Sequence, residues 1–149
     1  MRILIDADAC PVVDCTLAAA RDFGVACLLL CDTAHQLARP GAETIVVDQG
    51  ADSVDFALVD RLRPGDVVVT QDYGLAAMCL GRGAHPIRQD GLLYGPDNID
   101  ALLAVRHAAQ RVRRGGGRLR GPRRRTAAED IAFETALRRL LSELCGKSG

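Results

Sequence analysis

The chain has 149 residues, of which 48% are hydrophobic, 26% charged and 3% aromatic, and its formal net charge is zero. A chain of this length is typical of one domain with its own core, so we expect a single domain over residues 1–149. No apolar stretch reaches the roughly 18 residues that a membrane span needs and no signal-like segment opens the chain, so we expect a cytoplasmic protein without a membrane partner.

Short apolar runs and helical patterns alternate along the chain. In chain order, the predicted strands are Arg2–Asp6, Val25–Cys31, Thr44–Val47, Val67–Thr70 and Ala84–Ile87. The predicted helices, again in chain order, are Val12–Phe23, a helix that Asp52 or Ser53 caps and that runs to about Leu62, Tyr73–Leu80, Ile99 to about Val112, and Ala127–Cys145. This alternation predicts a three-layer α/β/α fold with a central, mostly parallel sheet, whose ligands lie beyond the carboxyl ends of the strands.

Five aspartates lie next to the predicted carboxyl ends of strands. They are Asp6, Asp8, Asp52, Asp55 and Asp72. Two carboxylates about 4 Å apart repel each other by about 4 kcal/mol at an effective dielectric near 20, so a cluster of them needs a positive partner. Hard divalent cations prefer oxygen ligands, and we therefore predict that these five aspartates bind Mg²⁺ or Mn²⁺.

Two other interpretations of the aspartates stay open. The first is helix capping, because Asp52 suits an N-cap and Asp72 resembles an Asx turn before Gly74. The second is a phosphate-transfer enzyme with Asp6 as nucleophile and Asp8 as acid. Such enzymes usually add a lysine from a later strand end, and the single lysine of the chain is far along it, so this interpretation and a small-molecule phosphohydrolase are disfavoured.

Three acidic segments resemble, in their order and spacing, the YaiI/YqxD family of uncharacterised bacterial proteins. They are residues 6–11 (DADACP), 50–55 (GADSVD) and 65–72 (GDVVVTQD). The resemblance covers almost the whole chain and implies one PIN-like or NYN-like nuclease domain, in which acidic residues at the sheet edge bind Mg²⁺ or Mn²⁺ and cut RNA. It implies catalytic roles for Asp6, Asp8 and Asp72.

The chain departs from the family pattern at two places. Tyr73-Gly74 stands where relatives often have Ile-Pro or Ile-Gly, which would alter the rim of the pocket. Ile131 stands where an arginine is common, which would remove a basic contact.

Positive charge is concentrated in one segment of the chain. Residues 1–105 contain 15 acids and 7 bases, whereas residues 106–125 contain 9 arginines and no acid. Glycines and a proline predict a basic loop over residues 112–125, and a solvated loop without a partner is the alternative. We predict that phosphates of single-stranded RNA bind to Arg111, Arg113, Arg114, Arg118, Arg120, Arg123, Arg124 and Arg125. Because aromatic residues are scarce, recognition should run through the backbone with little sequence preference.

The six cysteines are expected in the core and not in disulfides, because the chain is apolar enough to fold without them. Cys27, Cys31 and His35 have a zinc-like spacing. Cys27 and Cys31 are four residues apart in one predicted strand, so about 13 Å separates them, which excludes a shared zinc ion. Cys10 stands at a helix N-terminus, and we favour a packing role because no histidine is nearby in the sequence.

The leading functional hypothesis is a metal-dependent nuclease that hydrolyses phosphodiester bonds of RNA at the aspartates. The alternative is a non-catalytic RNA-binding or ribosome-associated module that keeps the acidic edge as a structural metal site. Tight, salt-sensitive RNA binding without cleavage would favour the alternative.

Overall fold

The computed structural model describes residues 1–8, 10–50, 53–104 and 125–147. Its strands are β1 (Arg2–Asp6), β2 (Ala26–Asp32), β3 (Glu43–Val47), β4 (Val67–Val69) and β5 (His85–Ile87). Its helices are α1 (Val13–Phe23), α2 (Ser53–Arg61), α3 (Tyr73–Gly81) and α5 (Ala127–Lys147), and residues 99–104 are also helical. These bounds lie within two residues of the predicted ones. The rest of the helix predicted to reach Val112, and the basic loop up to residue 124, lie outside the described residues.

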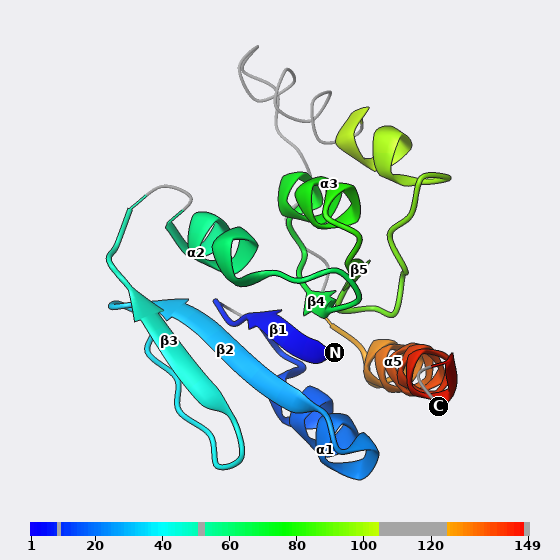
Figure 1. The fold of residues 1–149 in the computed structure, drawn as a ribbon, viewed down its shortest axis with the longest axis horizontal. Coiled ribbons are helices and arrows are strands. Elements are labelled where there is room, and N and C mark those ends of the chain that lie inside the picture. Colours follow the sequence, from blue (N-terminus) through cyan, green and yellow to red (C-terminus); the bar gives the residue numbers. More distant parts are fainter. Residues whose placement is uncertain (9, 51–52, 105–124, 148–149) are drawn as a thin grey trace.

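The five strands form one parallel sheet in the order β3-β2-β1-β4-β5 (Figure 1), which confirms the predicted parallel sheet. The chain first builds outward from β1 through β2 to β3, and then crosses back to place β4 on the other side of β1. The direction of winding therefore reverses between β1 and β4. In open α/β sheets, ligands bind at such a switch point, in the crevice outside the carboxyl ends of the strands.

Helices cover both faces of the sheet, which confirms the three-layer α/β/α class. Figure 1 shows α1 and α5 on one face and α2 and α3 on the other. The side chains of β1 alternate between these layers as the pleat requires. Ile3 and Ile5 pack in the cluster that contains Phe133 of α5, whereas Leu4 packs in the cluster that contains Leu58 of α2. Burial on both faces explains why the strands are continuous apolar runs.

One glycine lets the last helix approach the sheet closely. Gly91, in the loop after β5, has φ +94°, a conformation that L side chains rarely adopt. A Cβ atom at Gly91 would lie 2.7 Å from the backbone oxygen of Ala132 in α5. Only glycine therefore fits where the loop after β5 meets the backbone of α5.

The prediction that the cysteines lie in the core is confirmed for three of the six. All six are free, and Cys27, Cys31 and Cys79 are buried in the core, whereas Cys10, Cys15 and Cys145 are only partly buried. Nothing in the described part of the chain is a helix both long and apolar enough to span a membrane.

Candidate functional site

The carboxyl ends of the two strands at the switch point are joined by one hydroxyl group. Asp6 ends β1, and Thr70 and Asp72 follow β4. The Thr70 hydroxyl donates to Oδ2 of Asp6 at 3.1 Å and accepts from the backbone N–H of Asp72 at 3.0 Å. One carboxylate oxygen of Asp72 in turn accepts the N–H of Leu75 at 3.1 Å and caps α3, as the capping interpretation predicted.

Thr70 is held rigidly by its surroundings. It is fully buried, and its N–H donates to the carbonyl oxygen of Ile87 at 3.1 Å. Its own carbonyl oxygen accepts the hydroxyl of Tyr94 at 3.1 Å, and the ring of Tyr94 meets Tyr73 edge to face with 6.0 Å between centroids. The hydroxyl that links the two aspartates is therefore fixed by bonds on every side, and their separation is set by the core.

The Asp6 carboxyl group is destabilised as an anion. Burial, followed by the charges of Asp72 and Asp8, raises the pKa of Asp6 from 3.8 to about 6, although the hydrogen bond from Thr70 lowers it. Desolvation and like charges thus act together on one side chain. A group in this state gains from a nearby cation, which would stabilise the charged form.

A pocket of about 400 Å³ opens at this point, lined by Asp6, Gln71, Asp72 and Tyr73. The pocket offers two carboxylates, and Mg²⁺ commonly binds through one or two carboxylates while it keeps several waters. Across the described residues, no group of three or more His, Cys, Asp or Glu side chains is arranged to hold a metal ion. The structure therefore offers a pair of carboxylates in the pocket at the switch point.

Asp8 and a histidine occupy the rim of the site. The side chain of Asp8 is half exposed, and its carboxylate lies 3.6 Å from Nδ1 of His35. The same nitrogen lies 2.8 Å from a carboxylate oxygen of Asp32, which ends β2 beside β1. The hydrogen bond to Asp32 and then the charge of Asp8 raise the pKa of His35. Sequence reasoning missed Asp32, although a carboxylate at the end of a strand was the signal already used for Asp6, and it considered His35 only as a zinc ligand.

Asp55 is not among the residues that line this pocket. Asp55 lies in the first turn of α2, where its charge adds to burial in raising the pKa of the Cys79 thiol to about 12. Cys79 belongs to α3, so Asp55 acts on that helix, whereas the carboxylates that act on Asp6 are Asp72 and Asp8. Asp52 lies outside the described residues.

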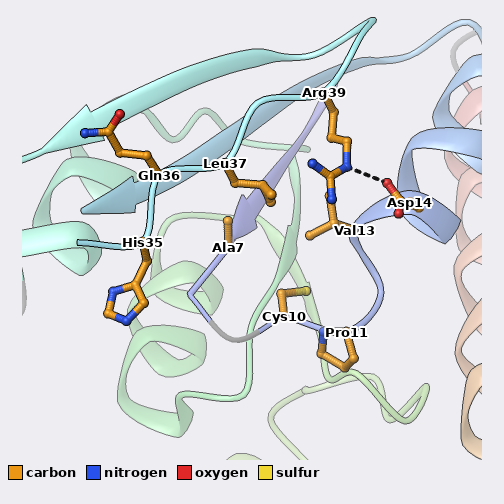
Figure 2. Close-up of a pocket in the computed structure, with 9 residues that line it drawn as sticks. All are labelled: Ala7, Cys10, Pro11, Val13, Asp14, His35, Gln36, Leu37 and Arg39. Atoms are coloured by element: carbon orange, nitrogen blue, oxygen red, sulfur yellow. Dashed lines mark hydrogen bonds and ion pairs between the residues drawn. The ribbon is translucent and has the colours of Figure 1, made fainter. Parts of the chain in front are cut away.

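A second pocket of about 340 Å³ lies between the loop after β1 and the segment that joins β2 to β3 (Figure 2). Figure 2 shows Arg39 bonded to Asp14 of α1, at 2.8 Å, on one side and His35 on the other. Cys10 lines this pocket, and burial raises the pKa of its thiol to about 11. At neutral pH the thiol is therefore protonated, which agrees with the packing role expected for Cys10.

Arg125 is the one predicted phosphate-binding arginine that the structure describes. Its Nε donates to Asp130 and its Nη2 donates to the carbonyl oxygen of Gln89, both at 2.6 Å. It lines a third pocket of about 160 Å³. This pocket is lined by Gln71, Tyr73, Arg88, Gln89, Asp90, Arg125 and Glu129. Arg111, Arg113, Arg114, Arg118, Arg120, Arg123 and Arg124 lie outside the described residues.

The third pocket adjoins the aspartate pocket, because Gln71 and Tyr73 line both. The side-chain amides of Gln71 and Gln89 are hydrogen-bonded to each other across the boundary. Sequence reasoning did not single out Arg88, since a lone arginine after a short strand carries no pattern of its own.

Comparison with known proteins gives one consistent result. A family described as "Uncharacterized BCR, YaiI/YqxD family" matches residues 4–143. A UPF0178 protein of Exiguobacterium sibiricum is 54% identical over 143 residues, which cover 96% of this chain and 98% of that protein. A UPF0178 protein of Clostridium acetobutylicum is 49% identical over 143 residues, with 95% and 97% covered. A UPF0178 protein of Clostridium novyi is 40% identical over 148 residues, with 99% of both chains covered. No solved structure matches the chain.

Proposed function

The chain belongs to the uncharacterised YaiI/YqxD family, and from this premise we propose that it is a divalent-metal-dependent nuclease that hydrolyses phosphodiester bonds, with single-stranded RNA as the expected substrate. The observation that carries the proposal is the convergence of Asp6 and Asp72 at the switch point of a parallel sheet, linked through Thr70. The proposed active site resembles that of a PIN-like nuclease domain, in which acidic side chains at the edge of the sheet bind the metal ion.

The donor set fits a hard divalent cation. Asp6 and Asp72 present carboxylate oxygens to one pocket, and burial and like charge make the Asp6 anion costly without a positive partner. When bound, Mg²⁺ or Mn²⁺ would supply Lewis-acid activation for phosphodiester hydrolysis. Support is strongest for Asp6 and Asp72, followed by Asp8, whose charge acts on Asp6.

The chain's own side chains divide the remaining work. Thr70 fixes the spacing of Asp6 and Asp72, because its hydroxyl bonds to one and accepts the backbone N–H of the other. Arg125 ends the predicted basic segment at a pocket that adjoins the aspartate pocket. In the proposed arrangement, the arginines hold the phosphate backbone while the aspartates hold the cation.

Substitution of the aspartates tests the proposal directly. Asp6→Asn and Asp72→Asn remove charge with little change in volume, and asparagine at position 72 can still cap α3. Each should reduce Mn²⁺-dependent cleavage of a labelled single-stranded RNA by about a hundredfold or more, as loss of a catalytic group commonly does. Asp14→Asn is the matched control, because Asp14 is 77% exposed and pairs with Arg39 on the surface.

Thermal unfolding followed by circular dichroism should show that all three variants are folded. Asp14→Asn should cleave as the unchanged protein does. Cleavage that persists in both Asp6→Asn and Asp72→Asn, or that proceeds equally in EDTA, would reject a metal-dependent nuclease that uses these residues.

The second candidate is the non-catalytic RNA-binding or ribosome-associated module, in which the acidic edge is a structural metal site. The same pair, Asp6 and Asp72, lines the pocket that would serve it, and Arg125 lines the adjoining pocket. For this candidate we expect salt-sensitive RNA binding that persists in Asp6→Asn and no cleavage with Mg²⁺ or Mn²⁺. The same labelled RNA, run on gels and in binding titrations, separates the two candidates.

A further inference from the structure

Two guanidinium groups from distant parts of the chain line the pocket of about 160 Å³ beside the aspartates. Arg88 follows β5, and Arg125 precedes α5. Their side chains are 25% and 23% exposed, so both are largely enclosed by protein yet open to solvent. Arginine presents a planar fork of donors that matches the oxygens of a phosphate group, so a pair of them in one pocket points to an anionic ligand.

Arg88 is aimed by its neighbours. Its Nε and Nη2 donate to the two carboxylate oxygens of Asp90 at 2.9 and 2.7 Å, which fixes the plane of the guanidinium. The third nitrogen, Nη1, lies 3.3 Å from the hydroxyl of Tyr73, a residue shared with the aspartate pocket. Asp90 therefore holds two nitrogens of Arg88, and the third contacts Tyr73, which also lines the aspartate pocket.

Arg125 is fixed in a similar way. Asp130 binds its Nε, and the carbonyl oxygen of Gln89 binds its Nη2. Between Arg125 and the other described residues, no hydrogen bond involves Nη1. Two rigidly held guanidiniums each retain donor capacity, which reduces the ordering cost of ligand binding.

The acids near this pocket pair with part of each guanidinium, Asp90 with Arg88 and Asp130 with Arg125, so a ligand would bind to the donor hydrogens that remain. Asp90 accepts the N–H of Leu92 as well as the bonds from Arg88, so it shapes the turn after β5. Glu129 and Thr126 form a reciprocal pair at the start of α5, where the Thr126 hydroxyl accepts the N–H of Glu129 and meets its carboxylate at 3.3 Å. This capping arrangement accounts for an acid beside the two arginines.

We propose that Arg88 and Arg125 form a phosphate-binding subsite, which takes a phosphate group of the substrate next to the one that lies at Asp6 and Asp72. This inference rests on the proposed function for the identity of the ligand, because a strand that crosses the aspartate pocket meets Gln71 and Tyr73 and then the two guanidiniums. In this proposal Arg88 recognises a phosphate group of the substrate. Arg125, the last residue of the predicted basic segment, lies in the same pocket beside the aspartates.

Orthophosphate tests the subsite without any cleavage assay. The ¹⁵N-labelled full chain is titrated with orthophosphate at constant ionic strength, and the Nε–H signals of Arg88 and Arg125, assigned from Arg88→Gln and Arg125→Gln, are followed. Both signals should shift and saturate, and each substitution should weaken binding by about tenfold, as expected for loss of one charge-assisted contact. Arg138→Gln is the control, because Arg138 also bonds to two acids, Asp22 and Glu134, but lines no part of this pocket.

The second arm uses a single-stranded RNA oligonucleotide with the Asp6→Asn background, in which cleavage is not expected. Adding Arg88→Gln should lower the slope of log affinity against log salt by about 0.7, the value for one phosphate contact to a single strand, and Arg138→Gln should not. Absence of a saturable orthophosphate shift would overturn the subsite. Orthophosphate binding without any effect of Arg88→Gln on RNA binding would overturn its role in holding a strand. Neither result decides whether the protein cleaves RNA, because cleavage is tested separately with Asp6→Asn and Asp72→Asn.

Discussion

The two ends of the sheet surround an aspartate with opposite kinds of partner. At the amino end, just before β4, Asp66 is 1% exposed and accepts the backbone N–H groups of Arg2 and Arg63 and the guanidinium of Arg2, at 2.9 to 3.0 Å. At the carboxyl end, Asp6 receives one side-chain hydrogen bond from Thr70 and has two acidic neighbours that raise its pKa to about 6.

The difference distinguishes a structural aspartate, Asp66, from a candidate functional one, Asp6. A buried carboxylate surrounded by donors joins the strands and is costly to remove, because its partners would lose their acceptor. A partly buried carboxylate beside other carboxylates opposes folding, and proteins keep such groups at functional sites. The number and sign of the partners therefore identify the candidate site better than burial does.

The same substitution should have opposite effects at the two ends, and the larger effect is expected at Asp66. Asp66→Asn removes the negative charge that pairs with the Arg2 guanidinium. It also places an amide NH₂ group, which is a donor, where the backbone N–H groups of Arg2 and Arg63 need an acceptor. We expect it to lower the free energy of unfolding by about 3 kcal/mol, as for other broken buried pairs with one partly exposed partner. Urea unfolding at pH 7.5 measures the change. A loss below about 1 kcal/mol would remove the contrast between the two ends.

Asp6→Asn should instead stabilise the metal-free protein. Because the pKa of Asp6 is raised to about 6 on folding, its contribution is most favourable at low pH and is lost as pH rises from about 3.8 to about 6. At pH 7.5 the free energy of unfolding of the variant should be higher by about 2 kcal/mol. This figure is the cost of ionising Asp6 in the folded protein, reduced because the side chain is partly exposed. Urea unfolding from pH 4 to pH 8 should show this dependence flattened in the variant, whereas equal pH profiles would contradict the raised pKa.

Thr70→Val should raise the pKa of Asp6 at the carboxyl end of the sheet without removing any charge. The Thr70 hydrogen bond lowers the pKa of Asp6, so its loss should raise that pKa further above about 6, by roughly half a unit or more. Carboxyl ¹³C chemical shifts followed against pH report the change. Thr44→Val is the control, since the Thr44 hydroxyl bonds to the carbonyl oxygen of Leu37 away from Asp6. An unchanged Asp6 titration would show that Thr70 does not hold this carboxyl group.

Asp14→Asn should have the smallest effect of the four. Asp14 is 77% exposed and pairs with a partly exposed arginine, Arg39, at 2.8 Å. Surface pairs of this kind contribute little, so the free energy of unfolding should change by less than about 0.5 kcal/mol. A larger loss would mean that exposed acids also support the fold, which would weaken the comparison between the two ends.

The strands and helices were predictable because each is encoded locally. The strands read as apolar runs bounded by turns, and β1 was predicted with its observed bounds, Arg2–Asp6. The convergence of Asp6 and Asp72 followed from one rule, that ligands gather at the carboxyl ends of parallel strands. Both inferences use only neighbouring residues and the parallel class of the sheet.

Strand order and long-range docking were not predictable from those patterns. Because β2 lies between β1 and β3, the helix that carries Asp55 starts from the edge strand, while Asp32 at the end of β2 lies beside β1. The basic pocket joins Arg88 to Arg125, and its formation depends on how α5 packs. No local pattern indicates that these two arginines, 37 positions apart, line one pocket.

The close fit at Gly91 has a consequence for the order in which the chain is made. Gly91 meets the backbone of α5 at Ala132, and Arg125 stands just before that helix. During synthesis, β1 and β4 emerge first and can bring Asp6 and Asp72 together, whereas the arginine pocket must wait for α5. A ribosome-bound chain that stops before α5 would thus contain Arg88 and Arg125 but lack the helix against which Gly91 packs and which supplies Glu129, so the arginine pocket would be incomplete.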